Sequence, residues 1–113
     1  GGTIIHEAVC CLLDGICKAK IPLESAIVGK IDKSICYSLR HLSTVVQQYA
    51  VTAFKSLCAS YYSNLSPETQ IELTVSKLIN HINSERNSML CQGYLLALGS
   101  CPANILWSSA EKA

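Results

Sequence analysis

The feature that most constrains the fold is an internal repeat of about 42 residues. Apolar residues recur with helical spacing in five segments, and the first, third and fifth segments superpose at offsets of 42 and 43 residues. The superposition aligns a column of small residues: Ala8, Ala50 and Gly93. It also aligns apolar residues: Ile4 with Val46 and Met89, Cys11 with Ala53 and Leu96, Leu12 with Phe54 and Ala97, and Ile16 with Cys58 and Cys101.

The apolar rows predict five amphipathic helices. We expect them over about residues 3–19, 23–42, 43–62, 67–83 and 85–101. Ser43, Ser66 and Ser84 are the expected N-caps, and Pro67 stands at the first helical position of the fourth helix. In the second and fourth helices the expected core rows are Ile27, Ile31, Ile35 and Leu39, and Ile71, Val75, Leu78, Ile79 and Ile82.

A period near 42 made of two helices is typical of HEAT and armadillo repeats, in which each helix pair buries its apolar face against the next pair. The alternative is coincidence, because all amphipathic helices share a period of 3.6 residues. The small-residue column argues against coincidence, since close helix contact requires a small side chain at a recurrent place. We therefore expect an all-α, HEAT/armadillo-like segment of an α-α superhelix. We expect residues 1–113 to form one segment of a longer solenoid, with 103–113 as a tail or the start of the next repeat.

Charge and composition exclude several classes of partner. The chain has 9 basic and 8 acidic residues and a formal charge of +1, so it carries no electrostatic footprint for nucleic acid or anionic lipid. No apolar run approaches the roughly 20 residues that cross a bilayer. We expect no nucleic-acid partner, no membrane insertion and a cytoplasmic location.

We expect the seven cysteines to be packing residues and not catalytic or metal-binding ones. They are scattered through apolar stretches, and their odd number fits free thiols in a reducing compartment. No C-x-x-C pair occurs and the three histidines are dispersed, so we expect no metal site, no cofactor and no catalytic residue. Cys11, Cys36, Cys58 and Cys101 are expected in the core, with Cys10 and Cys91 the more exposed. The stretch "CQGYLLALGSCP" (residues 91–102) is accordingly a core helix that ends before Pro102.

One column of the repeat predicts a surface contact. Tyr49 aligns with Glu7 and Gln92, two polar residues off the expected core face. Interfaces are enriched in exposed aromatic residues, although single exposed tyrosines are also common. Glu7, Tyr49 and Gln92 are therefore the candidate protein-contact residues.

Three stretches resemble the C-terminal region of the tubulin-folding cofactor D family, whose members are HEAT-repeat proteins. They are "HEAVCCLLDGICKAKIPLE", then "LRHLS" followed by "AVTAFKSLCASYY", then "GYLLALGSCPANIL". Their order and approximate spacing hold from about residue 5 to 106. Cys91 departs from the pattern, because the family has an arginine before the last stretch.

The resemblance implies a cytosolic, cytoskeleton-associated chaperone and not an enzyme. Such a protein binds β-tubulin, assists assembly and disassembly of the αβ heterodimer with cofactors E and C, and works with an Arf-like small GTPase. Two other classes stay open. One is a HEAT scaffold of another kind, for transport or for a phosphatase. The other is a small thiol enzyme, which would need a cysteine with a lowered pKa.

Overall fold

The computed structural model describes residues 2–112, and helices and short turns account for this whole range, with no strand in it. The elements are α1 (Gly2–Lys18), α2 (Ser25–Leu39), α3 (Thr44–Leu57), the π-helical turn η1 (Cys58–Tyr62), α4 (Pro67–Ile71), the π-helical turn η2 (Glu72–Ser76), α5 (Lys77–Ser84), the 3₁₀ turn η3 (Ser88–Cys91), α6 (Gln92–Gly99) and α7 (Ala103–Lys112). The prediction of an all-helical chain is confirmed.

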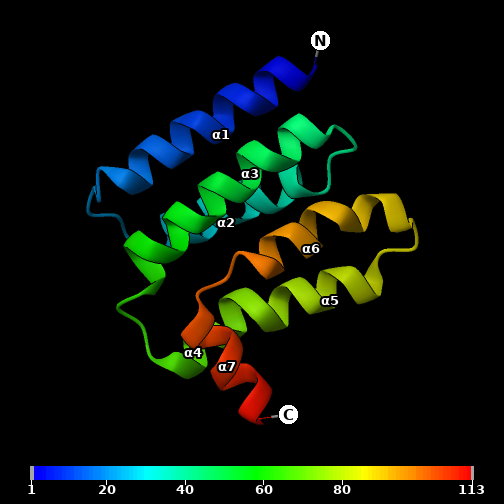
Figure 1. Ribbon diagram of the computed structural model, residues 1–113. Helices are drawn as coiled ribbons and strands as arrows, with labels where there is room; N and C mark the ends of the chain where they lie inside the picture. The colour runs from blue at the N-terminus through cyan, green and yellow to red at the C-terminus, as the bar shows by residue number, and fades with distance from the viewer. Residues whose placement is uncertain (1, 113) are drawn as a thin grey trace.

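The helices form two layers (Figure 1). Helices α1, α3 and α6 lie side by side in one layer, in which α3 packs against both of its neighbours. Helix α2 packs on α3, and α5 packs on α6, to make the second layer. α7 turns away at the end of the chain and packs on α4. The core lies between the layers, and Phe54 of α3 is among its largest fully buried side chains.

Hydrogen bonds between the helices connect residues about one repeat apart. The Ser56 hydroxyl of α3 donates to Asp14 of α1, 42 residues earlier. In the second layer Arg40, just after α2, pairs with Glu85, just after α5, at 2.6 Å and a separation of 45 residues. These separations of 42 and 45 residues are close to the offsets of 42 and 43 residues found in the sequence.

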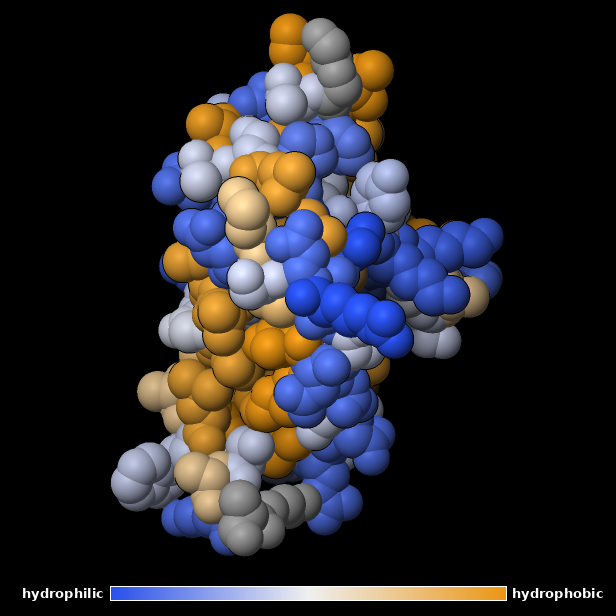
Figure 2. Space-filling model, turned by 90° about the vertical axis from the view of Figure 1, so that its right-hand side faces the viewer, coloured by the Kyte–Doolittle hydropathy of each residue, from blue (hydrophilic) through white to orange (hydrophobic). Residues whose placement is uncertain are grey.

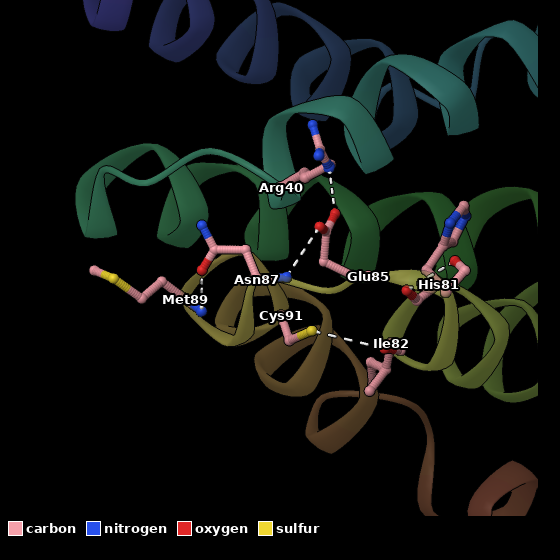
Figure 3. Close-up of polar contacts among 8 residues, drawn as sticks. Arg40, His81, Ile82, Glu85, Asn87, Met89 and Cys91 are labelled. Atoms are coloured by element: carbon pink, nitrogen blue, oxygen red, sulfur yellow. Dashed lines mark hydrogen bonds and ion pairs between the residues drawn. The ribbon is translucent and has the colours of Figure 1, made fainter.

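Two of the three predicted N-caps are confirmed. The Ser43 hydroxyl accepts from the Val46 amide at 3.4 Å, and the Ser66 hydroxyl accepts from the Thr69 amide at 3.2 Å. Ser84 does not cap a helix, because it is the last residue of α5 and its hydroxyl donates to the His81 carbonyl of the same helix. Asn87 caps the next helix instead, and its Oδ1 accepts from the Met89 amide at 3.0 Å (Figure 3).

The predicted core rows are correct for α3 and partly correct for α2, α5 and α6. All the predicted residues of α3 are buried. In the other helices, four residues assigned to the core are exposed: Ile27, Ile79, Met89 and Leu96. The physical reason is that α3 has neighbours on several sides, whereas each of the other helices leaves one side open.

The predicted core face of α1 is wrong. Cys10 and Cys17 are the buried residues of this helix, at 1% and 0% exposure. Their side of α1 is therefore the one that packs on the rest of the protein. The side chains that the apolar row placed in the core are exposed or only half-buried: Ile4, Ala8, Cys11, Leu12 and Ile16. Helix α1 packs through the side that carries Cys10 and Cys17 and not through its longest apolar row, so the periodicity of its sequence does not identify the buried face.

Candidate functional site

The three predicted contact residues occupy equivalent places on the α1/α3/α6 layer. Tyr49 is 41% exposed on α3, Gln92 is exposed on α6, and Glu7 is half-buried on α1. Seven residues after Glu7 and Tyr49, Asp14 and Ser56 share a hydrogen bond. Because seven residues make nearly two helical turns, Glu7 and Tyr49 lie at the same level of neighbouring helices. The prediction that Tyr49 is an exposed aromatic residue is confirmed.

Exposed apolar side chains extend this site, and the sequence analysis missed them. Val45 lies one turn before Tyr49 on α3 and is 47% exposed. Met89, Leu95 and Leu96 lie one turn from Gln92 and are also exposed. We call the surface formed by Val45, Tyr49, Met89, Gln92, Leu95 and Leu96 the layer surface. Spacing of three or four residues from Tyr49 and Gln92 is the signal that would have found it.

The layer surface has the chemistry of a protein interface and not of a site for charged ligands. None of its six residues carries a charge, and apolar side chains dominate it. Figure 2 shows one face of the molecule, on which apolar side chains gather in a strip in the lower half and polar side chains lie beside them. Exposed apolar groups with an aromatic residue are typical of surfaces that bind other proteins.

A salt bridge holds the loop beside the layer surface. Arg40 reaches from the end of α2 to Glu85, and the other carboxylate oxygen of Glu85 accepts from the Asn87 amide at 3.3 Å (Figure 3). The hydrogen bond from Arg40 lowers the pKa of Glu85 below its usual range. These contacts order the turn from α5 into η3, which carries Met89 into the layer surface.

A buried polar cluster joins α2 to the next repeat, and the sequence analysis missed it too. The carboxylate of Asp32 pairs with Lys77 at the start of α5 and accepts from the Tyr62 hydroxyl. The Cys36 thiol donates to the same carboxylate at 3.2 Å. Burial and the carboxylate raise the pKa of Tyr62. The cluster stabilises the packing between repeats and is closed to ligands, because Asp32 and Tyr62 are buried.

Most of the cysteines are packing residues, because six of the seven, all within the described part of the chain, are buried. Within the described residues no three His, Cys, Asp or Glu side chains gather where they could hold a metal ion. All seven thiols are free. Burial is the main cause that raises the pKa of Cys36 and of Cys58 to about 12. Thiols with such pKa values are protonated at neutral pH and are poor nucleophiles.

The predicted order of cysteine exposure is wrong in α1 and at the start of α6. Cys10 and Cys91 are buried, and Cys11 is the single exposed thiol among the seven, all of which lie in the described part of the chain. Cys10 and Cys11 are adjacent and point about 100° apart on the helix, so turning the packed face of α1 exchanges their environments.

We predict that Cys11 reacts first with a thiol reagent. In the native protein, iodoacetamide should label Cys11 roughly tenfold or more faster than the six buried cysteines, because access limits thiol reactivity. Peptide mapping by mass spectrometry over time measures the order. In urea all seven should react at similar rates, which is the control. Faster labelling of Cys10 than of Cys11 in native protein would contradict the observed packing of α1.

No single helix among the described residues has both the length and the apolar character needed to span a membrane. Ser88–Gly99 and Ala103–Glu111 together have the length and apolar composition of a membrane span, but the two segments are bent by 101° relative to each other.

No family model and no solved structure matches this chain.

Proposed function

We propose that this chain is a segment of a HEAT/armadillo-type scaffold that binds another protein through its layer surface. The observation that carries the proposal is the set of contacts between residues 42 to 45 positions apart, which join helix to helix across successive repeats. A stack of this kind presents the same helix positions side by side. The layer surface is such a row, and it is exposed, apolar and uncharged.

The client that the sequence resemblance favours is β-tubulin. In this proposal the chain belongs to a cytoplasmic tubulin-folding chaperone that acts with cofactors E and C and an Arf-like small GTPase. A broad helical surface suits a large protein client and requires no catalytic group of its own. The uncharged layer surface supports this use, because such a surface packs against protein without the cost of burying charge.

A titration with αβ-tubulin tests the proposal. The chain, labelled with a dye at its N-terminus, should bind tubulin weakly and saturably in fluorescence anisotropy. We expect Tyr49→Glu to weaken binding by roughly tenfold, since it places a charge in the interface. Ala26→Glu adds the same charge to an exposed position of α2 in the other layer and should bind like the wild type.

The outcomes separate the parts of the proposal. Absence of saturable tubulin binding would reject the tubulin client. Equal binding by Tyr49→Glu and wild type would reject the layer surface as the contact. A HEAT scaffold of another kind is the remaining alternative, and a transport or phosphatase scaffold would show the same fold without affinity for tubulin.

A further inference from the structure

One side of α1 carries an apolar stripe that no helix covers. It consists of Ile4, Ile5, Ala8, Cys11 and Leu12, and all five side chains are exposed. Ile4, Ile5 and Leu12 are 67%, 67% and 64% exposed. We call this set the α1 stripe. It contains no charged residue, and it faces away from Cys10 and Cys17, the residues that pack into the layer.

The repeat provides a direct comparison for the α1 stripe. The residues of α3 at the same places, 42 positions later, are Val46, Gln47, Ala50, Ala53 and Phe54. None of these five is more than 1% exposed. The same positions of the repeat are therefore exposed to solvent on α1 and buried on α3.

The second-layer helix α2 is what these positions face. α2 packs on α3, and the Gln47 amide donates to the His41 carbonyl, just past the end of α2, at 2.7 Å. On α6, the residue that aligns with Ala8 and Ala50 is Gly93, and a Cβ added there would lie 1.9 Å from the Leu39 carbonyl oxygen of α2. Gly93 thus meets α2 at close range, and Ala50, at the same place on α3, is fully buried.

We infer that the α1 stripe is a docking site for an amphipathic helix that packs antiparallel to α1, as α2 packs on α3. The fitting partner presents branched aliphatic residues every fourth position on one face, as Ile31, Ile35 and Leu39 do on α2. The small side chain of Ala8 lets the partner backbone approach closely, as Gly93 lets α2 approach α6.

A hollow beside the stripe extends the site. It measures about 330 Å³, lies between α1 and α2, and has Ile5, Val9 and Tyr37 in its lining. A helix on the α1 stripe would place side chains into this hollow and so contact α2 as well. The inference goes beyond the proposed function, and it does not depend on the identity of the client of the layer surface.

A peptide made from the chain's own α2 tests the inference. The probe is a fluorescein-labelled peptide of residues 23–42 with a hydrocarbon staple joining positions 30 and 34, which are exposed in α2 and one turn apart. The staple maintains the helix, because isolated helices of this length are marginal in water. It is added to the full chain, and binding is followed by anisotropy. We expect saturable binding with one peptide per chain.

Cys11 supplies an independent readout, because its thiol lies in the stripe and is the exposed one. Saturating peptide should slow its alkylation by iodoacetamide roughly tenfold or more. Leu12→Glu should weaken peptide binding by roughly tenfold or more, and its folding is checked by circular dichroism. Ala26→Glu is the matched control and should bind like the wild type.

Three results would overturn the inference: no saturable peptide binding, equal binding of a scrambled peptide with the same staple, or wild-type affinity in Leu12→Glu. Light scattering addresses a further occupant. If the chain forms a dimer that Leu12→Glu dissociates, a second copy covers the stripe, and the docking site for a partner helix is rejected.

Discussion

Gly93→Ala should destabilise the protein by about 3 kcal/mol, a large effect for the addition of one methyl group. The new Cβ would lie 1.9 Å from the Leu39 carbonyl oxygen and 2.8 Å from its carbon. Both atoms belong to the backbone of α2, which cannot move without opening the contact between α2 and α6. The clash therefore outweighs the roughly 1 kcal/mol that alanine gains over glycine inside a helix.

Gly99→Ala is the matched control for this prediction. Gly99 ends the same helix, and an added Cβ there would have no atom from another part of the chain within 4 Å. We expect its free energy of unfolding to equal that of the wild type or to exceed it slightly. Urea titrations of the three proteins measure the difference, and Gly93→Leu should be worse than Gly93→Ala. Equal stability of Gly93→Ala and Gly99→Ala would show that α6 does not approach α2 at Gly93.

Asp32→Ala should cost about 3 kcal/mol of stability, because it removes one partner of a buried ion pair. Lys77 would lose its counter-charge and Tyr62 would lose its acceptor. The side chain of Lys77 is 23% exposed, so contact with water reduces the loss of stability. If Lys77 were fully buried, we would expect a loss of stability near the upper end of the range for broken buried ion pairs, about 5 kcal/mol.

A double-mutant cycle with Lys77→Met separates the ion pair from packing. Lys77→Met alone leaves the Asp32 carboxylate without its cation, while the new side chain can still pack near Phe54, whose ring centre lies 5.9 Å from the Lys77 nitrogen. The double variant should therefore lose less stability than the sum of the single losses, by about 1–2 kcal/mol. Strict additivity in urea titrations would show that Asp32 and Lys77 do not interact.

Local signals in the sequence determined the helices. Ser43 and Ser66 cap helices because a hydroxyl next to the first turn binds its free amides, whatever the rest of the chain does. The rows of α3 were predicted correctly because this helix has neighbours on several sides, so its apolar residues are also its buried ones. The period of about 42 residues also matches the separation of Asp14 and Ser56, which share a hydrogen bond.

Only the tertiary structure decided where polar groups meet. Tyr62 ends the π-helical turn η1, and Lys77 directly follows the π-helical turn η2. A π turn contains an extra residue, which rotates the side chains after it relative to a regular helix. The composition of these segments gives no sign of either turn, so the meeting of Asp32, Tyr62 and Lys77 was not predictable from helical spacing.

The face of α1 and the layer surface depend on the tertiary structure for a different reason. The sequence by itself determined that α1 is an amphipathic helix with a long apolar row, and that α6 carries an apolar run. The structure decided that α1 packs through Cys10 and Cys17, and that Met89 and Leu96 stay exposed. Helical periodicity shows which residues of a helix form an apolar row, but the neighbouring helices determine which of these residues are buried.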